Sequence, residues 1–170
     1  YAYARVDIRG TGDWDGLIAD EYTPQGQEDA LEVIAWLAGE RGCSGAVGMM
    51  GISWGGFNSL QVAALRPPAL KAIVTCCSTD DRYADDVHYM GGAMLMGNPG
   101  WGGAMYLNNS RPPDPQVVGS RWRAMWLERL DRMATPWAIK WMSHQRRDAF
   151  WKHGSVCENY ADITCAVFAV

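Results

Sequence analysis

Hydrophobic positions in the first half of the chain follow two alternating patterns. Short apolar runs, each bounded by turn residues, predict buried strands at 1–8, 46–50 and 70–76. Apolar residues that recur every three or four positions predict helices at 24–40 and 57–65. The order strand, helix, strand, helix, strand indicates an α/β fold with a mostly parallel sheet, and we expect helices on both faces of that sheet.

Suitable capping residues stand at the ends of both predicted helices. Thr23 can accept a hydrogen bond as an N-cap, and Pro24 suits the first helical position because that position needs no N–H donor. Gly39 supplies a stop for the first helix. Pro67 ends the second helix, because proline cannot continue the hydrogen-bond ladder.

The second half of the chain has a helical pattern until its last residues. Asp114 and Pro115 form an N-cap and a first turn, and a further helical stretch is predicted at 137–152. A β-branched apolar run at 163–170 predicts a strand that returns to the sheet. We therefore expect the N-terminal part of the core at 1–78 and a helical cap insertion at 79–158. A truncated strand at 159–170 would then return to the core sheet.

Composition and absent motifs narrow the class of protein. The net charge of −4 argues against a broad basic surface for nucleic acid or anionic membrane, and no apolar run is long enough for a transmembrane helix. Five cysteines without a C-x-x-C pair indicate free thiols rather than a zinc site. The loop at 9–12 lacks the lysine of a phosphate loop and the spacing of a dinucleotide fingerprint. We expect no metal, no cofactor and a cytoplasmic location.

The clearest chemical signal is a G-x-S-x-G motif formed by Gly51, Ser53 and Gly55. It lies between the predicted strand at 46–50 and an apolar helix, the setting in which a sharp turn exposes a nucleophilic serine. Glycines are expected there because side chains would clash in so tight a turn. In this setting Ser53 Oγ would attack an acyl carbon, and the backbone N–H of Trp54 would donate to the oxyanion.

A nucleophilic serine also needs a histidine base and a carboxylate that orients it. With this turn the acid follows a later strand and the histidine comes later still, and the run at 163–170 fits the strand before the acid. No Asp, Glu or His follows that run, and we expect His88, His144 and His153 to be surface or packing residues. Because the chain also begins within a predicted strand, we expect a fragment truncated at both ends.

Acidic residues cluster directly after the predicted strand at 70–76: Asp80, Asp81, Asp85 and Asp86. This places them at the carboxyl edge of a parallel sheet, where ligands bind in open α/β folds. Two interpretations stay open. The cluster is either a solvated acidic loop, or a patch in which Asp86 and Asp85 bind a cationic substrate group such as a free α-amine.

Several stretches together resemble the CocE/NonD hydrolases, a group that includes cocaine esterase, the α-amino acid ester hydrolases and the Xaa-Pro dipeptidyl-peptidases. The stretches are DIRGTG at 7–12, CSGAVGMMGISWGG at 43–56 and PALKAI at 68–73. The resemblance covers nearly the whole chain and is most specific over 43–77. The chain departs from the family pattern at Trp14, where relatives tend to have Ser, and at Ala166, where they tend to have Pro.

This resemblance implies a nucleophile at Ser53 and an oxyanion donor at the N–H of Trp54, where relatives often have Tyr. The family's second oxyanion donor falls upstream of Tyr1, and its triad Asp and His fall beyond Val170. An amine-binding Asp of the amino acid ester hydrolases aligns near Asp86.

The sequence therefore predicts a partial α/β-hydrolase fold with an inserted helical cap. The predicted function is that of a serine hydrolase that cleaves an ester or an amide of a small-molecule or peptide substrate, without nucleic-acid or membrane partners. Two alternatives remain. The chain is a catalytically inert fragment, because it holds one of three triad members, or a binding protein that reuses the fold.

Overall fold

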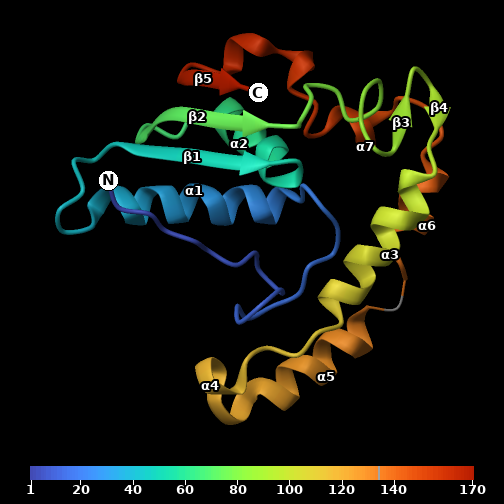
Figure 1. Cartoon of the computed structure of the whole chain (residues 1–170), viewed down its shortest axis with the longest axis horizontal. Helices are drawn as coiled ribbons and strands as arrows, with labels where there is room; N and C mark the ends of the chain where they lie inside the picture. The colour runs from blue at the N-terminus through green and yellow to red at the C-terminus, as the bar shows by residue number, and fades with distance from the viewer. Residues whose placement is uncertain (134) are drawn as a thin grey trace. The chain divides into compact units, whose positions relative to one another are not determined.

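The computed structural model describes residues 1–133 and 135–170 (Figure 1). These residues form two compact units, each assembled from two segments of the chain. The helical unit consists of Tyr1–Glu21 and Met96–Ser143, and the sheet unit consists of Tyr22–Leu95 and His144–Val170. The limits of the two units differ from those of the helical insertion expected at 79–158. That this insertion is a domain stays a prediction.

The sheet unit contains three parallel strands: β1 (Val47–Ile52), β2 (Leu70–Cys76) and β5 (Ala166–Ala169). Their order is β1-β2-β5, with Ile52 beside Cys76 and Thr75 beside Ala169. All three strands run the same way, so their carboxyl ends lie at one edge of the sheet. The parallel sheet and the strands predicted at 46–50, 70–76 and 163–170 are thereby confirmed.

Two helices pack against this sheet. Helix α1 (Pro24–Gly39) begins as predicted, because Thr23 Oγ1 accepts a hydrogen bond of 3.1 Å from the N–H of Gly26. Helix α2 (Trp54–Ala64) follows β1 after a single residue. Side chains of both helices and of β2 meet in one buried core: Ile34, Val62, Ala63, Leu70 and Ile73.

A second set of sheet side chains is apolar and exposed. Met50 of β1 is 68% exposed and Phe168 of β5 is 64% exposed. Both are register partners of Val74, so the three residues form a row across the sheet. The expectation of helices on both faces is wrong for the described residues, because α1 and α2 contribute to the same core. The row therefore has two exposed ends, Met50 and Phe168, and a partly buried middle residue, Val74.

The strand predicted at 1–8 does not form. These residues are exposed and pair with no strand in the part of the chain that the structure describes. A strand depends on hydrogen bonds to a neighbouring strand, and the described residues supply no such neighbour. The apolar pattern at 1–8 therefore indicates a preference for extended backbone, but no neighbouring strand among the described residues pairs with it.

The helical unit contains four α-helices among the described residues: α3 (Gly97–Asn109), α4 (Pro115–Val118), α5 (Trp122–Arg132) and α6 (Trp137–Ser143). The predicted N-cap is confirmed, because an Asp114 carboxylate oxygen accepts a 2.8 Å hydrogen bond from the N–H of Gln116. Gly119, with φ of 63°, then separates α4 from α5. No helix in the described ranges is both long enough and apolar enough to cross a membrane.

Helix α3 was not predicted, because its 13 residues include four glycines, which lower helix propensity. Gly102 has a packing role in this helix. A Cβ at that position would lie 2.6 Å from Cβ of Ala138, so the glycine lets α3 approach α6 closely.

The remaining segments of the sheet unit are short. The helical stretch predicted at 137–152 forms two separate helices, α6 of the helical unit and α7 (Ala149–Lys152) of the sheet unit. Asp148 begins α7 by accepting a 3.0 Å hydrogen bond from the N–H of Phe150. A small hairpin that was not predicted, β3 (Tyr89–Met90) and β4 (Ala93–Met94), follows β2. Two 3₁₀ turns, Val156–Glu158 and Tyr160–Asp162, precede β5.

Candidate active site

Ser53 lies on the turn between β1 and α2, at the carboxyl edge of the sheet. Its φ and ψ are 51° and −118°, a conformation that non-glycine residues rarely adopt, and the residue is exposed. Such backbone strain costs about 1–3 kcal/mol and persists only where the surroundings impose it. The sequence predicted both the turn and its position.

One motif glycine and one glycine outside the motif make this turn possible. A Cβ at Gly51 would lie 2.2 Å from the carbonyl carbon of Gly55, so no side chain fits there. A Cβ at Gly55 would meet nothing within 4 Å, and the expectation of a clash at Gly55 is therefore wrong. The second tight position is Gly56, where a Cβ would lie 2.7 Å from Ser78 Oγ and 2.9 Å from Thr75 Oγ1.

Backbone hydrogen bonds fix the turn to the neighbouring strands. The N–H of Ser53 donates to the carbonyl of Cys76 at 2.9 Å, and the carbonyl of Ser53 accepts from the N–H of Phe57 at 2.9 Å. The next residue, Cys77, has φ of 50° and donates its N–H to the carbonyl of Val170 at 2.9 Å. Cys77 thus lies outside β2, in agreement with the strand predicted at 70–76.

Trp54 is the first residue of α2, at the positive end of the helix dipole. Its side chain packs edge-on against the ring of Tyr22, with the ring centroids 6.4 Å apart. Tyr22 also contacts Phe57, one turn further along α2, at a centroid distance of 5.6 Å. A single buried ring therefore contacts both ends of the first turn of α2, beside Ser53.

Arg82 supports Tyr22 from the other side, an arrangement that sequence reasoning missed. The guanidinium carbon lies 4.6 Å from the centroid of the Tyr22 ring, and the residue is 1% exposed. Its Nη1 donates to the carbonyls of His153 at 2.8 Å and Phe150 at 3.2 Å. The same guanidinium also lies within cation–π range of the Phe150 and Trp151 rings. Arg82 and the rings of Tyr22, Phe150 and Trp151 form a buried cage. No local sequence pattern indicates this cage, because Arg82 is far in the sequence from each of these rings.

None of the three histidines forms a hydrogen bond with Ser53 among the described residues. His88 is buried beside Trp151, and its Nε2 lies 3.9 Å from Asp86 Oδ2. His153 Nε2 lies 2.6 Å from the carbonyl of Tyr22, and His144 Nδ1 lies 2.6 Å from an Asp148 oxygen. All three therefore have packing or capping contacts of their own, as the sequence suggested.

Two of the four clustered carboxylates hold the loop after β2 in place. Asp80 accepts a hydrogen bond from the hydroxyl of Tyr160. Asp81 accepts from the N–H groups of Tyr83 and Ala84 and pairs with Arg147 Nε at 3.1 Å. Burial by itself raises the pKa of Asp81, but these hydrogen bonds and the Arg147 charge outweigh it and lower that pKa below its usual value. Asp81 is therefore a structural anion at neutral pH.

The two carboxylates proposed for substrate binding differ in exposure. Asp85 is exposed, and its backbone pairs with Met90 in an isolated bridge. The Asp86 side chain is 6% exposed, and one of its oxygens accepts a 2.7 Å hydrogen bond from the N–H of Val87. Asp85 is thus the more accessible of the two.

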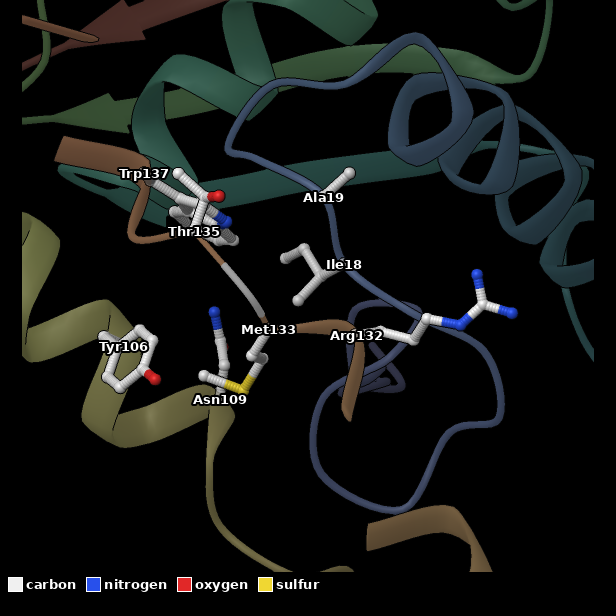
Figure 2. Close-up of a pocket in the computed structure, with 8 residues that line it drawn as sticks. All are labelled: Ile18, Ala19, Tyr106, Asn109, Arg132, Met133, Thr135 and Trp137. Atoms are coloured by element: carbon white, nitrogen blue, oxygen red, sulfur yellow. The ribbon is translucent and has the colours of Figure 1, made fainter. Parts of the chain in front are cut away.

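A separate pocket lies within the helical unit (Figure 2). Its volume is about 260 Å³, and its lining contains neither Ser53 nor the carboxylates at 80–86. No group of three His, Cys, Asp or Glu side chains within residues 1–133 and 135–170 is arranged to hold a metal ion.

A strained serine between a parallel strand and the helix that follows it, with a glycine two residues before it, defines an α/β-hydrolase fold. The comparison with protein families agrees with this class. The chain belongs to the X-Pro dipeptidyl-peptidase (S15) family, whose model matches residues 1–170. The resemblance noted from the sequence is thereby confirmed.

Individual relatives agree with the family. A Mycobacterium bovis protein assigned to the serine esterases is 31% identical over 85 residues, which are 50% of this chain and 14% of that protein. A crystal structure of a CocE/NonD family hydrolase from Staphylococcus aureus matches with a TM-score of 0.69 and 24% identity, over 93% of this chain and 25% of that one. An α-amino acid ester hydrolase matches with a TM-score of 0.62 and 24% identity, over 96% and 30%. The match thus covers about a seventh of the mycobacterial relative's length.

Proposed function

We propose that this protein is a serine hydrolase in which Ser53 attacks the carbonyl carbon of an ester or an amide. The observation that carries the proposal is the exposed, positive-φ conformation of Ser53 at the carboxyl end of β1 and the start of α2. Membership of a hydrolase family supports the reaction class. The family is described as a peptidase family, which supports an amide substrate. The mycobacterial relative is assigned as an esterase, which supports an ester substrate, so the proposal includes both.

The proposed reaction proceeds in two steps. In the first step, Ser53 Oγ forms a bond to the acyl carbon, its proton passes to a base, and the alcohol or amine leaves with a proton. The N–H of Trp54 would donate to the developing oxyanion, aided by the helix dipole. In the second step, water attacks the acyl-Ser53 ester and releases the acid. The Tyr22 ring against Trp54 would keep this donor in place.

We further propose that the acid and the base come from residues outside these 170. The histidines within the chain are engaged elsewhere, and the relatives are several times longer than the matched region. The isolated chain would then hold the nucleophile without its activating groups. On this proposal it would react with acylating agents at least about 10³-fold more slowly than the full-length protein.

A fluorophosphonate probe tests the proposal, because it phosphonylates only an activated serine. We expect the full-length protein to be labelled, the Ser53→Ala variant to lose labelling, and the isolated chain to react far more slowly. Ser44→Ala is the matched control, since Ser44 is exposed and lies before β1. Labelling that survives Ser53→Ala would assign the reaction to another residue. An unlabelled full-length protein would favour a binding protein that reuses the fold.

We also propose that Asp85 and Asp86 bind a cationic group on the substrate, such as a free α-amine. They follow β2, whose carboxyl end lies beside Ser53, since the Ser53 N–H bonds to Cys76. Both carboxylates precede the hairpin formed by β3 and β4. A carboxylate pair at this edge would attract a protonated amine close to the reacting carbonyl.

Paired substrates test the role of these carboxylates. We expect Asp85→Asn and Asp86→Asn in the full-length protein to lower kcat/KM for an amino-acyl ester by about tenfold, and to leave the matching acyl ester without an amine nearly unchanged. Equal losses on both esters would show that the carboxylates support the fold rather than the substrate.

A further inference from the structure

The pocket of the helical unit is formed by four segments of that unit. Tyr106 and Asn109 come from the last turn of α3, and Trp137 is the first residue of α6. Ile18 and Ala19 close it from the N-terminal segment. Arg132, Met133 and Thr135 complete the lining (Figure 2).

The pocket's size fits a small ligand. Cavities of about 150 Å³ hold benzene, and pockets for drug-sized molecules begin at about 300 Å³. The volume here, about 260 Å³, lies between these two values. It therefore has room for one six-membered ring and a short substituent.

Aromatic and apolar groups form about half of the pocket's walls, and polar groups form the rest. The rings of Trp137 and Tyr106, the thioether of Met133 and the side chain of Ile18 all contribute. Aromatic rings favour other rings in edge-on or offset contacts, and methionine sulfur favours ring contacts as well. These walls therefore suit a planar ring better than a flexible chain.

The polar groups of the lining include the hydroxyls of Thr135 and Tyr106 and the carboxamide of Asn109. Asn109 is 8% exposed, and its side chain extends into the pocket in Figure 2. The guanidinium of Arg132 points away from the other lining residues, and no lining residue is acidic. The pocket thus offers a ligand no strong charge, while a carboxamide provides both donors and an acceptor.

We propose that this pocket binds an uncharged single-ring aromatic amide, with the ring between the aromatic walls and the amide paired with Asn109. Two carboxamides can form a pair of hydrogen bonds, in which the N–H of each donates to the carbonyl oxygen of the other. The proposal is independent of the proposed hydrolase function, because the pocket shares no residue with the Ser53 turn.

Isothermal titration calorimetry of the full-length protein with benzamide tests this proposal. We expect saturable binding in the millimolar range, typical of so small a ligand. Asn109→Leu should weaken benzamide about tenfold and leave toluene binding unchanged, because only the amide contact is lost. Asn108→Leu is the matched control, since Asn108 is exposed on the same helix and does not line the pocket.

A second variant keeps the test decisive should Asn109→Leu fold poorly. Ala19→Phe places a ring in the pocket from an exposed position, and we expect it to abolish benzamide binding. Benzamide that binds wild type and Ala19→Phe equally would overturn the proposal. So would the absence of saturable binding, which would show that the pocket holds water only. Neither result would affect the assignment of Ser53.

Discussion

Replacing Gly51 by alanine is expected to destabilise the protein by about 3 kcal/mol or more. The added Cβ would lie 2.2 Å from the carbonyl carbon of Gly55, and a backbone atom cannot move aside as a side chain end can. The turn that carries Ser53 would have to open, so labelling of Ser53 should fall together with stability. Urea denaturation followed by circular dichroism measures the loss.

Gly55→Ala is the matched control for this prediction. It adds the same methyl group four residues away, where nothing lies within 4 Å, and alanine is a better helix former than glycine. We expect its stability to equal or slightly exceed that of wild type. If the two variants had equal stabilities, the close approach between Gly51 and Gly55 would be refuted.

Replacing Arg82 by methionine should cost about 3 kcal/mol or more. Methionine keeps an apolar stem but removes the donors to the carbonyls of His153 and Phe150, and an unsatisfied buried carbonyl costs about 1–3 kcal/mol. The cation–π contact with Tyr22 is lost as well. Because Tyr22 packs against the first turn of α2, Ser53 labelling should slow in the same variant.

Two further substitutions separate the contributions of Arg82. Arg82→Lys keeps the positive charge but loses the planar guanidinium with its several N–H donors. We therefore expect a loss of stability between zero and that of Arg82→Met. Arg146→Met removes an exposed arginine from the same unit and should change stability by less than about 0.5 kcal/mol. A loss for Arg82→Met no larger than for Arg146→Met would contradict the buried cage.

Local signals in the sequence were sufficient for the elements that position Ser53. The Thr23 N-cap, the strand at 70–76 and the serine turn each depend on residues within a few positions of one another, and all three are present. These features follow from backbone chemistry that neighbouring residues decide.

Predictions failed where distant segments decide the outcome. The apolar run at 1–8 forms no strand, because strand formation depends on a partner that the pattern cannot identify. Helix α3 was missed because its glycines lower helix propensity, whereas packing against Ala138 makes Gly102 suitable there. The contact of Arg82 with Tyr22 spans 60 positions, so only the folded structure reveals it.

The candidate site was predicted in the same uneven way. The sequence placed Ser53 and Trp54 on the turn between a strand and a helix, and the acidic cluster after the carboxyl end of β2, where the structure also has them. Their roles in catalysis and binding stay predictions. The sequence did not distinguish the structural Asp81 from the exposed Asp85, because that difference depends in part on Arg147, which is 66 positions from Asp81. It also assigned to Gly55 a steric role that belongs to Gly56.

Peptide mapping of the fluorophosphonate adduct in the full-length protein tests the central claim most directly. If Ser53 is the nucleophile, the phosphonyl group will be found on the peptide that contains positions 51–56, and on Ser53 within it. An adduct on any other serine, with Ser53 unmodified, would contradict the proposed role of this turn.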